Sequence, residues 1–394
     1  MKAIRKFDNK AILIWGYGRE GQSTEQFLRR CCRPKSIEIF EGKREDIHED
    51  WYDYIIKSPG IAMDGDDPKY TSQTEIFLEA FAGRTVGVTG TKGKSTTAAM
   101  LHSVLSEGLN KKVIFLGNIG EPCLSHFEEV DGNTVVVFEM SCHQLAHTAF
   151  SPHIAVFLNL YEEHLDYYKT FDRYFAAKQN ISRHQTGKDV LYIGAQVPPF
   201  QTKAKKIVID EPVGKYDLKI LGGHNNYNAE FVFRVATEQF HIDPGTVRDI
   251  LHDFEGLPHR LQFIGEKDGI LYYDDSISTI PDATVHALQS VPHAYSVLIG
   301  GMDRGIDYGT LVRFMKEHKE YAYICMYDSG RRILDELGEQ ENCYYAKDLQ
   351  AAVKLAGSVT PQGRACILSP ASASYGFFTN FEERGDKFRE YAGL

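Results

Sequence analysis

The chain has 394 residues, 43% of them hydrophobic and 25% charged, and a formal net charge of −10 at pH 7. This composition is typical of a globular protein of roughly two to four domains. The acidic balance excludes an extended basic surface, so we expect no nucleic-acid partner. Neither a run of about 18 apolar residues nor a secretion signal is found, so we expect no membrane association. Seven scattered cysteines favour reduced thiols in a cytoplasm.

Strand and helix signals alternate from the first residues onward. Apolar runs at 11–16, 36–42 and 53–61 predict strands, and residues 19–32 predict a helix. This order is typical of an open parallel sheet. The pattern restarts near residue 82 and again after residue 258. The further predicted strands are 85–90, 112–117, 134–141, 154–160, 270–276, 294–301, 321–328 and 365–372, and the further predicted helices include 94–108 and 171–184.

The two restarts predict an α/β protein of three domains. We expect a Rossmann-like N-terminal domain at 1–82, a central ATPase domain of P-loop type with a mainly parallel sheet at 83–257, and a Rossmann-like C-terminal domain at 258–394. In such sheets ligands bind beyond the carboxyl ends of the strands. The motifs described next follow predicted strands, which favours binding at those ends.

A glycine-rich segment, GVTGTKGKSTTAAML at 87–101, joins a predicted strand to a predicted helix. The strict P-loop pattern fails because its first glycine would fall on Val88. A phosphate site is still predicted, since glycines let backbone N–H groups face an anion at a helix N-terminus. Lys94 would neutralise phosphates and Ser95 would ligate Mg²⁺. The alternative is an ordinary turn with a serine cap. The predicted ATP-binding loop comprises Gly90, Thr91, Lys92, Gly93, Lys94, Ser95 and Thr96.

A second glycine-rich segment, GYGREG at 16–21, follows the first predicted strand. Glu41 ends the next predicted strand, about 20 residues further on, as in a dinucleotide site. By itself this pattern supports an NAD-binding oxidoreductase as an alternative function. The same loop geometry also suits the diphosphate of a UDP-sugar.

Three polar side chains stand out beside the apolar strands. Glu139 ends one of them, where a buried carboxylate needs a metal or a cation. His164, in EEHLD, is by itself a hydrogen-bonding loop residue. Lys178 lies within a predicted helix, where a solvated surface lysine is the ordinary interpretation.

The segment GTKGKST resembles the phosphate loop of the Mur ligases, the ATP-dependent amino-acid-adding enzymes of peptidoglycan synthesis. Further motifs follow in the order of that family across nearly the whole chain. The last of them, together with SPGIA at 58–62, is most similar to the glutamate-adding members. The motifs are GNIG (117–120), FEMSCHQL (138–145), NLYEEHLDYY (159–168), YFAAKQNI (174–181), GGHNNYNA (222–229), GLPHRLQF (256–263), YDDSIST (273–279), GGMDRGIDY (300–308) and LSPASASYGFFTNFEERGDKF (368–388).

The resemblance implies a catalytic site with ATP and two Mg²⁺ ions, in which Lys94, His164 and Lys178 are the catalytic residues. The implied metal ligands are Ser95, Glu139, His164 and Lys178, the last as a carbamate formed with CO₂. The resemblance also implies that Asn225 and Asn228 hold adenine, for which their amides offer donors and acceptors, although both are common turn residues. Arg260 and Asp275 would reach the phosphate and the ribose of ATP.

The resemblance further implies sites for the two other substrates. The implied UDP-substrate residues are Tyr17, Gly18, Arg19, Glu41, Ser58 and Asn118. The implied glutamate residues are Thr279, Arg304, Ser374 and Phe381. The chain departs from the family pattern at three places. Ile277 replaces a nucleotide-contacting lysine, Arg304 replaces the lysine that holds the glutamate side chain, and the turn at 374–376 reads Ser-Tyr-Gly. Arginine is longer and planar, so the second change is not neutral.

The activity implied by the resemblance is the ATP-dependent addition of D-glutamate to UDP-N-acetylmuramoyl-L-alanine through an acyl phosphate. The protein would act on these small molecules as a cytoplasmic monomer. Arg304 leaves L-glutamate open as the amino acid. Two different activities also stay open at this point, that of a related Mur or folylpolyglutamate-type ligase and that of an NAD-binding oxidoreductase.

Overall fold

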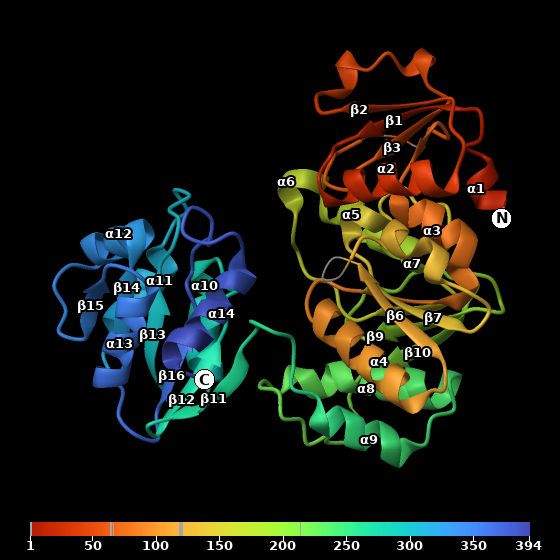
Figure 1. Ribbon diagram of the computed structural model, residues 1–394. Helices are drawn as coiled ribbons and strands as arrows, with labels where there is room; N and C mark the ends of the chain where they lie inside the picture. The colour runs from red at the N-terminus through yellow and green to blue at the C-terminus, as the bar shows by residue number, and fades with distance from the viewer. Residues whose placement is uncertain (1, 64, 66, 118–120, 213) are drawn as a thin grey trace. The chain divides into compact units, whose positions relative to one another are not determined.

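Three sheets flanked by helices make up the fold (Figure 1). The computed structural model describes residues 2–63, 65, 67–117, 121–212 and 214–394. The chain forms two compact units, Met1–Leu218 with His224–Phe254, and Lys219–Gly223 with Glu255–Leu394. No helix within the described ranges is both long and apolar enough to cross a membrane.

The first sheet is parallel, with strand order β2-β1-β3-β4. Its strands are β1 (Ala11–Trp15), β2 (Ser36–Phe40), β3 (Tyr54–Lys57) and β4 (Tyr70–Thr71), and its helices are α1 (Lys2–Arg5), α2 (Arg19–Cys31) and α3 (Gln73–Phe81). The side chains of β1 are buried on both faces from Ile12 to Trp15. A continuous apolar run is the pattern that a parallel strand covered on both sides requires.

The second sheet is also parallel, with order β10-β9-β8-β5-β7-β6. Its strands are β5 (Thr85–Thr89), β6 (Lys112–Gly117), β7 (Thr134–Glu139), β8 (Ile154–Phe157), β9 (Val190–Gly194) and β10 (Lys205–Ile209). Its helices are α4 (Lys94–Gly108), α5 (Cys142–Leu145), α6 (Leu165–Tyr168), α7 (Phe171–Arg183), α8 (His224–Gln239) and α9 (Pro244–Asp253). Helices α4, α8 and α9 pack together beside this sheet (Figure 1). Strand β5 is buried throughout and ends at the predicted phosphate loop.

These first two sheets share one hydrophobic core, which explains why they form a single compact unit. Phe77, from α3, packs against Phe81, Phe127 and Phe138, and Phe27 of α2 packs against Phe127. Such aromatic pairs add stabilisation beyond their buried area. The restart of the pattern near residue 82 therefore marks a change of sheet inside a continuous core. We propose the division 1–82, 83–257 and 258–394 because each range contains one sheet.

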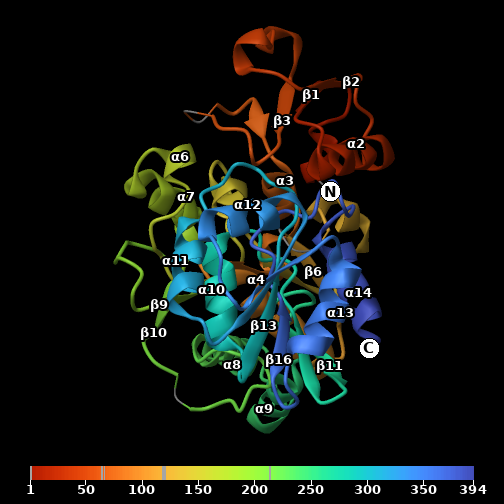
Figure 2. The ribbon, with the colours of Figure 1, turned by 90° about the vertical axis from the view of Figure 1, so that its left-hand side faces the viewer.

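The third sheet has the order β11-β12-β16-β13-β14-β15, parallel except for β11. Its strands are β11 (Gln262–Lys267), β12 (Ile270–Asp274), β13 (Ala294–Ile299), β14 (Ala322–Met326), β15 (Cys343–Ala346) and β16 (Ala365–Leu368). Its helices are α10 (Pro281–Ser290), α11 (Gly309–Glu317), α12 (Tyr327–Leu337), α13 (Leu349–Val359) and α14 (Phe381–Ala392). Helices α10 to α12 share one buried cluster with the sheet, and α13 and α14 share another. In Figure 2, α10 and α11 lie on one side of β13 and β16 and α13 lies on the other.

Candidate active site

The segment between β5 and α4 forms a tight glycine loop at the helix N-terminus. Gly93 has a φ of 69°, in the left-handed region that glycine adopts without strain. A Cβ at Gly93 would also lie 2.7 Å from Oδ1 of Asn228, on α8. Asn228 and Asn225, both on α8, are buried, and Nδ2 of Asn228 donates to Oδ1 of Asn225 over 3.0 Å. The two asparagines therefore lie against the loop.

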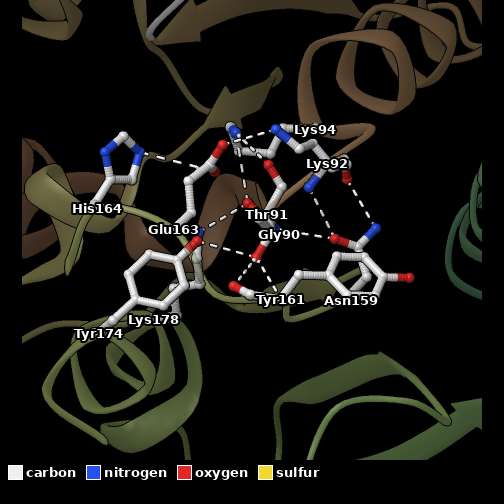
Figure 3. A network of polar contacts seen from close by, with 10 residues as sticks. All are labelled: Gly90, Thr91, Lys92, Lys94, Asn159, Tyr161, Glu163, His164, Tyr174 and Lys178. Atoms are coloured by element: carbon white, nitrogen blue, oxygen red, sulfur yellow. Dashed lines mark hydrogen bonds and ion pairs between the residues drawn. The ribbon is translucent and has the colours of Figure 1, made fainter. Parts of the chain in front are cut away.

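Asn159 fixes the shape of the loop from the end of β8. Its Oδ1 accepts hydrogen bonds from the backbone N–H groups of Thr91 at 3.0 Å and Lys92 at 2.8 Å (Figure 3). Its Nδ2 donates to the Lys92 carbonyl oxygen at 2.9 Å. Sequence reasoning placed Asn159 in a predicted strand and gave it no role. The only signal was its position, since a buried asparagine beyond a central strand needs partners for both ends of its amide.

The two lysines of the loop have different surroundings. Nζ of Lys94 lies 3.4 Å from the carbonyl oxygens of Gly90 and Thr91, so it folds back over the loop. Lys92 is exposed and forms an ion pair of 2.7 Å with Glu163 (Figure 3). A half-buried ammonium over an anion cradle suits phosphate neutralisation better than an exposed, paired one.

Ser95 and Glu139 form a buried polar pair at the carboxyl ends of adjacent strands. Strands β5 and β7 pair in parallel, with Val88 opposite Glu139. The Ser95 hydroxyl donates to Oε1 of Glu139 over 3.0 Å, and Glu139 is fully buried. Mg²⁺ prefers such hard oxygen donors and is commonly held by one or two carboxylates, with phosphates and water completing its shell. The pair therefore fits Mg²⁺, although the described ranges contain no cluster of three or more His, Cys, Asp and Glu side chains that would hold a metal alone.

Lys178 is buried, so the surface lysine suggested by its position in the helix is wrong. It is 1% exposed, and its Nζ donates to the Gly90 carbonyl oxygen over 2.8 Å (Figure 3). The ammonium also lies 5.0 Å from the ring centroid of Tyr174, one turn earlier on α7. Burial lowers the pKa of Lys178 to about 7, because a charged amine is costly in a dry environment.

His164 lies across the same space, at the start of α6. It adopts a left-handed backbone conformation with a φ of 56°. Its ring centroid lies 5.0 Å from that of His143 and 6.1 Å from that of Tyr174. Burial is the main cause that lowers the pKa of His143 to about 4, and the nearby Lys178 ammonium adds to it. His143 is therefore neutral at pH 7.

One cavity of about 310 Å³ brings the three predicted catalytic residues together. Lys94, His164 and Lys178 all line it. Glu20 and Gln144, which sequence reasoning did not select, line it too and are joined by a hydrogen bond of 3.1 Å from Nε2 of Gln144. A larger cavity of about 830 Å³ is lined by other α7 residues, such as Arg173 and Asn180, and contains none of the predicted catalytic side chains.

The GYGREG segment forms the tight turn between β1 and α2. A Cβ at Gly21 would lie 2.2 Å from the Gly16 carbonyl oxygen, so close helix–strand packing requires glycine there. Ser58 donates to that same carbonyl oxygen over 3.0 Å. The Tyr17 hydroxyl donates to Glu25. Three further predicted UDP-substrate residues, Gly18, Arg19 and Glu41, are exposed. The last one, Asn118, lies outside the described residues.

The predicted ATP residues of the second unit meet at one turn. The Asp275 carboxylate accepts from the backbone N–H of Leu261, next to the exposed Arg260, at 3.2 Å and from Ser369 at 2.9 Å. Burial raises the pKa of Asp275 to about 6. Asp275 thus anchors the turn that carries Arg260.

The predicted glutamate residues lie on loops beyond strands of the third sheet. Nη2 of Arg304 donates to the Thr279 carbonyl oxygen over 3.1 Å, which joins the loops after β13 and β12. Ser374 is buried in the loop after β16, and Phe381 begins α14. These loops follow neighbouring parallel strands, so their residues share one edge of the sheet.

A mainly parallel α/β fold whose glycine loop opens a helix, beside a cavity lined by two lysines, is typical of a phosphate-binding protein. The Mur ligase middle domain matches residues 88–210 of the chain. The chain is 30% identical to the UDP-N-acetylmuramoylalanine–D-glutamate ligase of Aquifex aeolicus, over 96% of this chain and 97% of that protein. The corresponding enzyme of Streptococcus agalactiae is also 30% identical, over 98% of each chain. The chain belongs to the Mur ligase family.

Solved structures agree on the fold. The MurF ligase of Thermotoga maritima, in complex with ADP, gives a TM-score of 0.58 at 16% identity and covers 100% of this chain and 96% of its own. The UDP-N-acetylmuramate-alanine ligase MurC of the same organism also gives 0.58, at 19% identity, with 97% and 98% covered. These likenesses confirm the predicted α/β fold class. With the family established, the oxidoreductase alternative is set aside.

Proposed function

We propose that the protein is an ATP-dependent ligase that joins D-glutamate to the L-alanine carboxylate of UDP-N-acetylmuramoyl-L-alanine. One observation carries the proposal: Lys94, His164 and Lys178 line one cavity beside the glycine loop, in a chain whose full-length relatives bear that enzyme name. The cavity of about 310 Å³ supports small-molecule substrates, and the proposal includes a monomer in the cytoplasm.

The first step is attack of the substrate carboxylate on the γ-phosphoryl group of ATP, which gives an acyl phosphate and ADP. Lys94 neutralises charge on the transferred group, because its ammonium lies over the glycine loop at the N-terminus of α4, where phosphate would bind. Asn159 holds the loop in the required shape. In the second step the glutamate amine attacks the acyl carbonyl, phosphate leaves, and an amide forms.

Two Mg²⁺ ions are part of the proposal. Ser95 and Glu139 would hold one, and His164 with Lys178 the other. When bound, Mg²⁺ neutralises the charge that develops on phosphate oxygens during transfer. Lys178 can ligate only as a carbamate, which is anionic. Its burial and its lowered pKa support this, because a neutral amine is the form that reacts with CO₂.

The amino acid is D-glutamate in the proposal, and L-glutamate is the second candidate. Arg304 favours testing both, since its guanidinium replaces the shorter lysine expected from the family and bonds the Thr279 carbonyl oxygen. The deciding experiment measures phosphate release with ATP, Mg²⁺ and UDP-N-acetylmuramoyl-L-alanine, with D-glutamate, L-glutamate or no amino acid. Release with D-glutamate alone supports the proposal. Release with L-glutamate alone moves the protein to the second candidate, and release with neither overturns both.

A further inference from the structure

Arg384, on α14, is fully buried and donates to three acceptors. Its Nε donates to the Ser276 hydroxyl at 3.0 Å and its Nη2 to the Ser276 carbonyl oxygen at 2.7 Å. Its Nη1 donates to the Ser372 carbonyl oxygen at 3.0 Å. The acceptors are thus a hydroxyl and two carbonyl oxygens. The sequence motif NFEERGDKF contains Arg384, but the motif alone predicts no role for it.

The two serines belong to neighbouring loops at one edge of the sheet. Strands β12 and β16 pair in parallel, with Asp274 opposite Leu368, so the loops that follow them leave the sheet side by side. The loop after β12 carries Ser276 and Thr279, and the loop after β16 carries Ser372 and Ser374. Arg384 therefore joins the loops that carry two of the predicted glutamate residues.

Two further contacts extend this network to the other predicted glutamate residues. The Ser276 hydroxyl donates to the Phe381 carbonyl oxygen over 2.8 Å. The loop after β13, which carries Arg304, meets the loop after β16 where the Met302 N–H donates to the Ala373 carbonyl oxygen over 2.9 Å. Hydrogen bonds thus connect the segments that carry all four predicted glutamate residues. These residues are Thr279, Arg304, Ser374 and Phe381.

A guanidinium suits this task better than other side chains. Its planar fork donates in several fixed directions at once, whereas a lysine ammonium is a point charge on a flexible stem. Burying the charge is costly, and the nearby Asp274 carboxylate offsets only part of that cost. Burial accordingly lowers the pKa of Arg384 to about 10, well above pH 7, so the side chain remains charged. A hydrophobic residue would fill this space at lower cost, which suggests that the hydrogen bonds have a purpose beyond stability.

We propose that Arg384 is a positioning residue for the amino-acid substrate, holding the loops after β12 and β16 at the spacing that the glutamate pocket requires. This inference rests on the proposed function. Loss of the guanidinium would let the two loops move apart and weaken binding of glutamate. The UDP-substrate would bind as before, because its predicted loop at residues 16–21 belongs to the other compact unit.

The test compares Arg384→Met and Arg384→Lys with Arg389→Met, an exposed arginine on the same helix. We expect Arg384→Met to raise the KM for glutamate about tenfold or more, since several hydrogen bonds from a charged group are lost. KM for the UDP-substrate should change less than about twofold. Arg384→Lys should fall between wild type and Arg384→Met, and Arg389→Met should match the wild type.

A second variant decides the matter if Arg384→Met fails to fold. Ser276→Ala removes the Nε acceptor and the bond to Phe381 while keeping the arginine. It should also raise the KM for glutamate selectively. An unchanged glutamate KM in the folded variants, or an equal rise of KM for glutamate and for the UDP-substrate, overturns the inference. If the wild-type protein releases no phosphate with either glutamate isomer, the proposed function itself is overturned. If the wild type is active and the variants keep its glutamate KM, only the role of Arg384 is overturned.

Discussion

Nζ of Lys178 lies 2.8 Å from the carbonyl oxygen of Gly90, so a buried lysine touches the first residue of the phosphate loop. If this amine is carbamylated, removal of CO₂ and bicarbonate should reduce ligation, and their return should restore it. Lys178→Arg should lose about a hundredfold or more of the activity, because arginine stays cationic and forms no carbamate ligand. Both effects are measured as phosphate release.

The matched control is Lys169→Arg, at an exposed lysine just before α7. It should respond to bicarbonate as the wild type does. Full activity of Lys178→Arg would remove Lys178 from the metal ligands.

Lys94→Ala should abolish ATP-dependent ligation, with a loss of about a hundred- to a thousandfold in kcat, because no other group would neutralise the transferred phosphoryl charge in the same way. The UDP-substrate should still bind, which equilibrium titration would show. Lys92→Ala is the control within the same loop, since Lys92 is exposed and paired with Glu163. Its effect should be much smaller. Retained turnover in Lys94→Ala would contradict the assignment.

Asn159→Ala should raise the KM for ATP about tenfold, because two loop N–H groups and one carbonyl lose their partner. The expected loss is in nucleotide binding, so KM for the UDP-substrate should stay near the wild-type value. Asn133→Ala, at an exposed turn, is the control. An unchanged ATP affinity would mean that the loop keeps its shape without Asn159.

The main strands and the loop were predictable because their signals are local. Strands β5, β7 and β8 are continuous apolar runs, which predict buried strands. The glycines before Lys94 predict a tight loop, because glycine adopts backbone conformations that other residues avoid. Strands β4, β9, β10, β11 and β15 were not predicted. Strand β10 shows why, since its sequence KKIVI lies at a sheet edge and is partly polar. The predicted strand 154–160 was also too long, because β8 ends at Phe157 and Asn159 turns to the phosphate loop.

Side-chain surroundings were less predictable, because they depend on contacts between distant segments. Lys178 looks like a surface residue from its place in α7, yet the fold buries it against Gly90, 88 positions earlier. Gln144 and Glu20 meet across 124 positions. Arg384 reaches Ser276 across 108 positions. Periodicity within a helix or strand contains no information on such pairs.

Arg304→Ala tests the arginine predicted to hold the glutamate side chain. We expect it to raise the KM for glutamate about tenfold, because a carboxylate would lose its cationic partner. Arg304→Lys should retain most of the affinity, and any change in preference between D- and L-glutamate would show in the ratio of their kcat/KM values. Arg313→Ala, at an exposed site on α11, is the control. Unchanged glutamate kinetics in Arg304→Ala would exclude Arg304 from the pocket.

His259 and Asp274 form an ion pair of 2.7 Å in the second compact unit, with Asp274 buried at the end of β12. The pair packs against Gly385, where a Cβ would lie 2.1 Å from Nδ1 of His259. The hydrogen bond to Asp274 is the main cause that raises the pKa of His259 above its ordinary value of 6.5, and Asp386 adds to it. Protonated His259 is therefore favoured in the folded state.

This pair should make the stability of the protein depend on pH. A histidine whose pKa is raised in the folded state adds stability that is fully present below the unfolded value of about 6.5 and is lost as pH rises through the folded value. The wild type should therefore exceed His259→Gln in melting temperature by more at pH 6 than at pH 9. For His286→Gln, at an exposed site on α10, the difference in melting temperature from the wild type should be the same at pH 6 and pH 9. A gap that stays constant between pH 6 and pH 9 would mean that His259 acts in the fold without its charge.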